Sequence, residues 1–144
     1  MANNFTGELV ARQLTGGYRW EIWEAFSYRV GDANSDVVVR VPKGFITDFA
    51  SIPRGLWNIW PPAAGKHSKP AVVHDALYWR GWIEAHGVQK RITRKEADDI
   101  FKEALEVAGV NWLSRQIIYA GVRVGGSSTW NRYRWVDGDV ETSD

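Results

Sequence analysis

Three side chains that could do chemistry lie within five residues, His74, Asp75 and Tyr78. In a helix, residues three and four positions apart share a face, so the imidazole, the carboxylate and the phenol would point the same way. Val73 and Leu77 beside them indicate that this face approaches the core, where an ionised aspartate is costly unless it is paired or binds a cation. Two interpretations are open: a histidine that acts as a base, or a buried hydrogen-bond network with a purely structural role.

A fourth chemical group, Asp98, lies in the helix expected next along the chain. Thr93 and Glu96 form a capping-box pattern that predicts a helix over residues 94–108. Asp98 borders its apolar face, and two helices packed as an antiparallel hairpin would bring this carboxylate to His74 or Tyr78. There it would orient the imidazole ring and fix its tautomer. The alternative is a carboxylate that only stabilises the helix N-terminus through the helix dipole.

The stretch "GFITDFASIP" places the carboxylate of Asp48 among apolar residues. Such a carboxylate is either a base or ligand, or part of an Asx-turn that shapes the loop. Thr47 and Ser51 are its expected supporting residues, and Ser51 lacks the G-x-S-x-G surroundings of a nucleophile. We therefore predict His74, Asp48, Asp98 and Tyr78 as catalytic residues. Asp75 together with Asp48 is the candidate ligand set for a divalent cation.

Composition narrows the possible chemistry. The chain has 144 residues and no cysteine, which excludes disulfides and a cysteine nucleophile. Its net charge of +1 gives no steering toward nucleic acid, and a basic cluster is interpreted as a solvated face: Lys90, Arg91, Arg94 and Lys95. No apolar run is long enough to span a membrane, and the first residues lack the features of a signal peptide. We expect a protein made in the cytoplasm of its host cell.

The order of the predicted strands and helices along the chain indicates an α+β fold. Alternating apolar residues indicate antiparallel strands in the first half, around residues 18–24 and 36–41. A long irregular loop follows from Phe45, and then about three helices over residues 68–82, 94–108 and 112–125, the first with Ser68 as N-cap. Residues 129–135 are a possible short last strand. We expect one domain over residues 1–136 and a flexible acidic tail over residues 137–144.

Several stretches, taken in order, resemble the DUF1353 family of tailed phages and prophages: "VPKGFITDFASIPR", "AVVHDALYWRG", "TRKEADDIFKEAL" and "RQIIYAGVRVGG". The resemblance covers roughly Phe5 to Gly126. It implies a small α+β protein of phage origin, without an activity that can be carried over. The positions that match the family pattern are Gly44, Thr47, Asp48, Ser51, Pro53, His74, Asp75, Tyr78, Ala97, Asp98 and Phe101.

A second, local resemblance concerns only the spacing H-D-x-x-Y. It is similar to the core of secreted phospholipases, in which a helix histidine activates water and the adjacent aspartate binds calcium. The resemblance implies that His74 is the base, Asp75 a metal ligand, and Asp98 with Tyr78 the orienting pair. The cysteines and the glycine-rich calcium loop of those enzymes are missing from this chain.

Two function classes follow from these observations. The first is a phage-encoded hydrolase centred on His74, with a role in lysis of the host or passage into it, acting on bacterial envelope components. The second is a non-catalytic virion component of the tail or baseplate, in which the His-Asp-Tyr cluster is structural and some of the nine tryptophans contact other phage proteins. A protein that inhibits host defence by binding is a third possibility.

Overall fold

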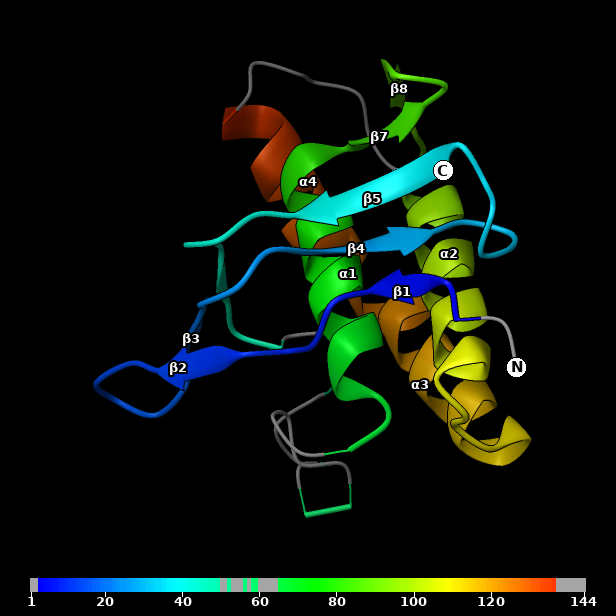
Figure 1. Cartoon of the computed structure of the whole chain (residues 1–144). Helices are drawn as coiled ribbons and strands as arrows, with labels where there is room; N and C mark the ends of the chain where they lie inside the picture. Colours follow the sequence, from blue (N-terminus) through cyan, green and yellow to red (C-terminus); the bar gives the residue numbers. More distant parts are fainter. Residues whose placement is uncertain (1–2, 50–51, 53–55, 57, 60–64, 137–144) are drawn as a thin grey trace.

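The computed structural model describes residues 3–49, 52, 56, 58–59 and 65–136, and has an α+β fold (Figure 1). Its five-stranded sheet has the order β1-β4-β5-β7-β8, with β1 Phe5–Thr6, β4 Phe26–Arg29, β5 Val37–Val41, β7 Trp82–Ala85 and β8 Val88–Arg91. A second sheet has the order β2-β3-β6, with β2 Ala11–Gln13, β3 Trp20–Ile22 and β6 Ile46–Thr47. All of the pairings are antiparallel, as predicted for the first half of the chain.

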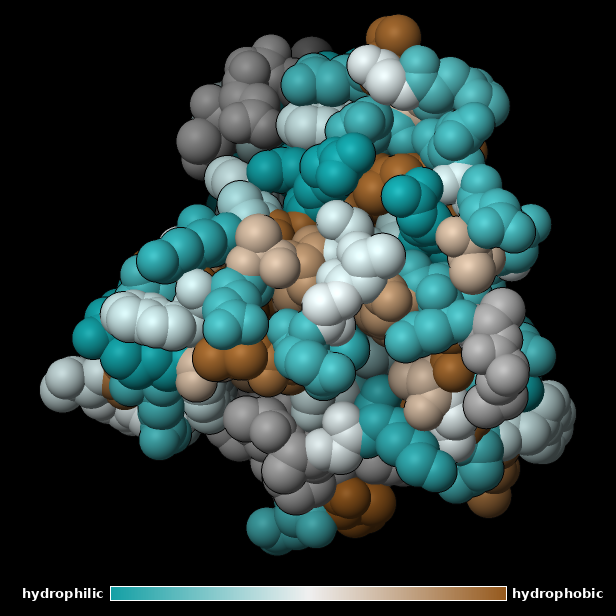
Figure 2. Space-filling view, viewed as in Figure 1, coloured by the Kyte–Doolittle hydropathy of each residue, from teal (hydrophilic) through white to brown (hydrophobic). Residues whose placement is uncertain are grey.

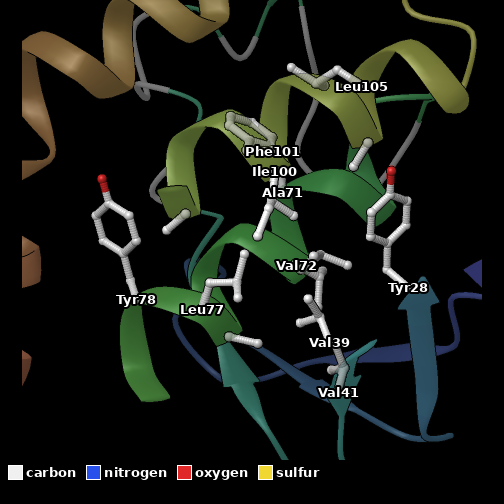
Figure 3. Packing of buried hydrophobic residues seen from close by; sticks show 14 of the residues in the cluster. Tyr28, Val39, Val41, Ala71, Val72, Leu77, Tyr78, Ile100, Phe101 and Leu105 are labelled. Atoms are coloured by element: carbon white, nitrogen blue, oxygen red, sulfur yellow. The ribbon is translucent and has the colours of Figure 1, made fainter. Parts of the chain in front are cut away.

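Helix α1, Ser68–Arg80, is the central element of the fold (Figure 1). Strands β1, β4 and β5 cross one side of it, and α1 contacts helices α2 and α4 as well as β5. Figure 3 shows Ala71, Val72 and Leu77 of α1 packed among residues of the strands and of α2. Because α1 is covered on several sides, its polar side chains must find partners inside the protein.

Helices α2, Arg94–Val107, and α3, Trp112–Gly125, confirm two of the predicted helices. Thr93 and Glu96 form the complete capping box, and the side chain of Asn111 accepts a hydrogen bond from the backbone N–H of Ser114. These caps satisfy backbone donors that a helix N-terminus otherwise leaves unpaired. Local sequence signals were therefore sufficient to find where α2 and α3 begin.

The predicted last strand is wrong, because residues 127–136 form a helix, α4 (Ser127–Val136). The described part of the chain thus has four helices and not about three. Trp130 and Arg134 are one helical turn apart, and both are buried. Arg134 Nη2 donates hydrogen bonds to the carbonyl oxygens of Tyr78 and Trp79, each at 2.8 Å. These contacts with the last turn of α1 favour a helix over a strand.

The boundaries of α1 also differ from the prediction. The helix ends at Arg80, because Gly81 adopts a left-handed conformation with φ 69°, and its N–H bonds to the carbonyl of Leu77. Trp82 begins the β7–β8 hairpin, which was not predicted. The upper part of Figure 2, where Figure 1 places this hairpin, is mostly hydrophilic with a hydrophobic residue at its tip. Ser68 is not the N-cap, since the helix begins at this residue.

None of the helices in the described ranges is long and apolar enough to cross a membrane, as predicted. The predicted tail, residues 137–144, lies outside the described residues.

Gly81 gives a direct test of how α4 packs on the end of α1. A Cβ atom added at Gly81 would lie 2.2 Å from Nη1 of Arg134. Gly87 is the matched control, because it also has a positive φ, of 80°, but open space around the same position. We expect Gly81→Ala to lower the free energy of unfolding by about 1–3 kcal/mol more than Gly87→Ala, as measured by urea denaturation. Equal losses would contradict the packing of Arg134 against Gly81.

Candidate functional site

The carboxylate of Asp98 is the centre of a buried polar cluster. Asp98 has no exposed surface. Its Oδ1 lies 2.6 Å from Nε2 of His74 and 2.6 Å from the hydroxyl of Tyr78, both on α1. Its Oδ2 accepts hydrogen bonds from Arg123 of α3 at 2.8 Å and from Arg94 of its own helix at 3.4 Å. We call these five residues the Asp98 cluster.

The electrostatics of the cluster favour an ionised aspartate and a neutral histidine. Burial by itself would raise the pKa of Asp98, but the hydrogen bonds from His74, Tyr78 and Arg123 outweigh it and hold the pKa below its ordinary value. Burial lowers the pKa of His74 by more than the neighbouring carboxylate raises it. Burial, and then the bond to Asp98, raises the pKa of Tyr78, which therefore stays protonated.

These protonation states fix the tautomer of His74. An ionised Asp98 can only accept hydrogen bonds, so Nε2 of the neutral ring carries the proton and donates it to Oδ1. The ring lone pair then belongs to Nδ1. Two aromatic neighbours hold the ring in place, Phe101 in a stacked arrangement at 4.4 Å between centroids and Tyr78 at 4.3 Å. The His74 ring is thus held by the hydrogen bond at Nε2 and by its contacts with the rings of Phe101 and Tyr78.

A pocket of about 390 Å³ lies next to the Asp98 cluster. Segments from both halves of the chain line it, among them β6, α1, α3 and α4. The residues that line it are Arg19, Phe45, Ile46, Thr47, Asp48, His74, Asp75, Tyr78, Gly121, Val122, Gly125, Gly126, Thr129, Arg132 and Tyr133. This volume falls within the range of about 300–1,000 Å³ that is typical of small-molecule sites.

Strand β6 connects the pocket to α1 through Thr47 and Asp75. The hydroxyl of Thr47 donates a hydrogen bond to Oδ2 of Asp75, and Thr47 Oγ1 accepts one from the backbone N–H of Phe49 at 3.2 Å. Thr47 is itself paired with Trp20 of β3. Phe49 has a positive φ of 53°, a conformation that is costly for a residue with a bulky side chain. Fully buried packing against Trp20 holds it there, with the rings 5.1 Å apart.

Most of the residues predicted for the site come together, but in two layers. The pocket wall contains His74, Asp48, Asp75, Tyr78 and Thr47. Asp98 meets His74 and Tyr78 as predicted, yet it is buried behind the ring and is not among the lining residues. Asp98 thus contacts His74 and Tyr78 from the side away from the pocket lining. Ser51 and Pro53 lie outside the described residues.

The proposed cation ligands are only partly supported. Asp48 and Asp75 line the same pocket. Among the described residues, however, no group of three His, Asp or Glu side chains is arranged to hold a metal ion. Magnesium is commonly bound through one or two carboxylates with water as its other ligands, so a cation at Asp48 and Asp75 stays a prediction.

Sequence reasoning missed several residues of the site. Arg94 was assigned to a solvated basic face, but it is buried and bonds to Asp98, and the i,i+4 spacing of the two residues was an available signal. Arg123 could not be found in this way, since it reaches Asp98 from α3. Gly121 and Gly125 of α3 were interpreted only as parts of a helix. They have open space where a side chain would stand, which leaves room for the pocket.

The fold and the site define a class, a small α+β protein with a buried His–Asp pair beside a pocket. The model of the family described as "Protein of unknown function (DUF1353)" matches residues 20–122, and the chain belongs to this family. The match includes β3 to β8, α1, α2 and most of α3, and thus all residues of the Asp98 cluster except Arg123. No curated protein and no solved structure matches the chain.

Replacing Asp98 tests whether its charge holds the cluster together. Asp98→Asn would leave Arg94 and Arg123 without their carboxylate, and we expect a loss of about 3–5 kcal/mol in the free energy of unfolding. The adjacent Asp99→Asn is the control, because Asp99 is exposed and its pairing with Lys95 is a surface ion pair. That variant should lose less than about 1 kcal/mol. Urea denaturation at pH 7 measures both, and similar losses would contradict a central role for Asp98.

Proposed function

We propose that this protein is a hydrolase in which His74 acts as the general base. The observation that carries the proposal is the imidazole of His74, which bonds to Asp98 at 2.6 Å and also lines the pocket. A base needs a free-base form at working pH and a fixed direction for its lone pair. Burial lowers the pKa of His74 and supplies the first, and Asp98 with Phe101 supplies the second.

In this mechanism Nδ1 of His74 takes a proton from a water molecule in the pocket, and the water oxygen attacks the substrate. The imidazolium then passes this proton to the leaving group. Asp98 stabilises the imidazolium and keeps the tautomer that places the lone pair on Nδ1, a role like that of the aspartate in a Ser-His-Asp triad. The roles of His74 and Asp98 agree with those implied by the phospholipase-like spacing.

Tyr133 of α4 supplies a hydrogen-bond donor for the negative charge that develops on the substrate. Its side chain lines the pocket, and burial, followed by the charges of Asp75 and Asp48, raises its pKa. The hydroxyl therefore stays protonated at neutral pH. Donors that face the developing charge in a site shielded from water lower the barrier of such reactions. None of these steps requires the cation predicted at Asp48 and Asp75.

The biological setting is part of the proposal and is supported only by the family resemblance. We place the hydrolase in a phage or prophage, made in the bacterial cytoplasm and acting on envelope components during lysis or infection. The pocket size supports a small substrate group and not an extended polymer surface.

The activity is tested with a panel of chromogenic esters, amides, glycosides and phosphodiesters. We expect His74→Gln to lower kcat/KM at least about 100-fold, because general-base catalysis contributes that much or more. Glutamine keeps a donor for Asp98, so the fold should survive, as circular dichroism would verify. His86→Gln is the control, since the His86 side chain is 77% exposed and should not affect turnover. Activity that survives in His74→Gln would refute the base role.

The pH dependence of the same activity follows from the direction of the pKa shift. A base must be neutral, and burial moves the pKa of His74 below its ordinary value of 6.5. The rate of the wild-type enzyme should thus be level between pH 7 and 8 and fall only below about 6.5. A rate that still rises between pH 7 and 8 would contradict this assignment.

A second candidate function, a non-enzymatic virion component, is favoured by large apolar side chains that α3 exposes. Trp112, Leu113 and Val124 are 63%, 61% and 86% exposed. Exposed aromatic and aliphatic groups of this kind are typical of surfaces that contact another protein.

Virion incorporation tests this second function. If it is correct, mass spectrometry of purified particles should find the protein, and Leu113→Ser with Val124→Ser should remove it from them. The His74→Gln variant should still be incorporated. Absence of the wild-type protein from the particles would rule out the virion role.

A further inference from the structure

Four charged side chains line the pocket beside His74, two acidic and two basic. Asp48 and Asp75 contribute carboxylates, and Arg19 and Arg132 contribute guanidinium groups. We infer that the pocket binds a zwitterionic ligand of the amino-acid or short-peptide class, with its ammonium group at the two aspartates and its carboxylate at the two arginines.

The acidic side of the pocket is formed by Asp48 and Asp75 around Tyr133. Asp48 is exposed, and Asp75 is half-buried. After burial, the charges of both carboxylates raise the pKa of Tyr133, and the charges of Arg132 and Arg134 act on it in the opposite direction. The carboxylate of Asp75 accepts the hydroxyl of Thr47, and an ionised carboxylate has about four lone-pair positions in all.

The basic groups that line the pocket are Arg19, which precedes β3, and Arg132 of α4. Within the described ranges, no hydrogen bond or ion pair holds either guanidinium, and Arg132 contacts the ring of Tyr133 at 5.9 Å. Other exposed arginines of the sheets are paired, Arg12 with Glu21 and Arg40 with Glu84, both at 2.7 Å. The two arginines that line the pocket are thus available for a carboxylate, which a guanidinium can bind through two hydrogen bonds.

The combination of charges selects the ligand class. A purely anionic ligand would be repelled by Asp48 and Asp75, and a purely cationic one by Arg19 and Arg132. A ligand that carries both charges meets an opposite charge at each end. Phe45 and Val122 add apolar parts of the wall that suit the aliphatic part of an amino acid or dipeptide. The pocket volume of about 390 Å³ accommodates a molecule of this size.

The consequence for chemistry depends on the proposed function. If His74 is the base, the substrate bond is a peptide amide. The water oxygen bonds to the carbonyl carbon as its proton moves to Nδ1, and the C–N bond breaks as that proton moves to the leaving nitrogen. One amine and one carboxylic acid result, with water as the only co-reactant. Because Asp75 follows His74 in α1, we place the ammonium end of the substrate beside the imidazole.

Binding is tested by NMR titration of the ¹⁵N-labelled full chain with alanyl-alanine, its N-acetyl derivative and its C-terminal amide. The free dipeptide should shift the amide signals of Thr47, Gly121 and Gly125. We expect it to bind at least 10-fold more tightly than either blocked form, since each block removes one charge. Equal binding of all three probes, or no shifts at the pocket, would overturn the inference.

Two variants test which side chains bind each charged end of the dipeptide. Asp48→Asn should abolish the preference for the free dipeptide over the N-acetyl form and keep the preference over the amide. The double variant Arg19→Gln with Arg132→Gln should do the reverse. The matched double variant Arg12→Gln with Arg40→Gln, whose arginines lie outside the pocket, should change neither preference. Identical effects of the first two variants would contradict the proposed orientation.

The titration separates this inference from the proposed function, because binding is measured without turnover. His74→Gln should keep the charge preferences. A dipeptide that binds with these preferences but is not hydrolysed supports the inference and refutes the hydrolase. Hydrolysis of other substrates that depends on His74, with no preference among the three dipeptide probes, refutes the inference alone.

Discussion

A single buried carboxylate, that of Asp98, sets how three helices of this protein meet. An isolated charge in the core would be prohibitively costly, so the fold must bring donors to it from several directions. His74 and Tyr78 come from α1, Arg94 from α2 itself and Arg123 from α3. Each donor has a defined direction, and a shift of one helix along another would break at least one bond. The cluster therefore specifies the register of α1, α2 and α3 as well as stabilising their contact.

The pocket is a consequence of this fixed register. Arg94 also donates to the carbonyl of Val122 at 3.1 Å, which holds the last turns of α3 against α2. At Gly126 an added Cβ would lie 2.5 Å from the hydroxyl of Tyr78, so only glycine lets the chain pass that close before α4 begins. Helix α4 then packs Trp130 against the ring of Tyr78, at 5.2 Å between centroids, and brings Tyr133 to the pocket wall. The pocket beside His74 thus depends on the glycines of α3 and on the packing of α4 against α1.

The parts of this arrangement that were predictable from sequence are those with local signals. The capping residues Thr93 and Asn111 marked two helices, and the spacing of His74 and Tyr78, together with the position of Asp98 beside an apolar face, predicted their meeting. Helix α4 was missed because its alternating aromatic and polar residues also fit a strand. Contacts made by Arg134 with α1, more than fifty residues away, decide the outcome. The opposed charges of the pocket were likewise not predictable, since Arg19 and Arg132 come from opposite ends of the chain.

The position of His74 between the cluster and the pocket favours a chemical role over a purely structural one. A structural network needs only to pair its own polar groups, and Asp98 accepts hydrogen bonds from Tyr78, Arg94 and Arg123. It gives no reason for the imidazole also to form part of the wall of a pocket that carries charges of both signs. In the proposed mechanism the two surroundings have separate tasks. Asp98 on the buried side fixes the tautomer, burial keeps the ring neutral, and the pocket side brings the ligand to the ring.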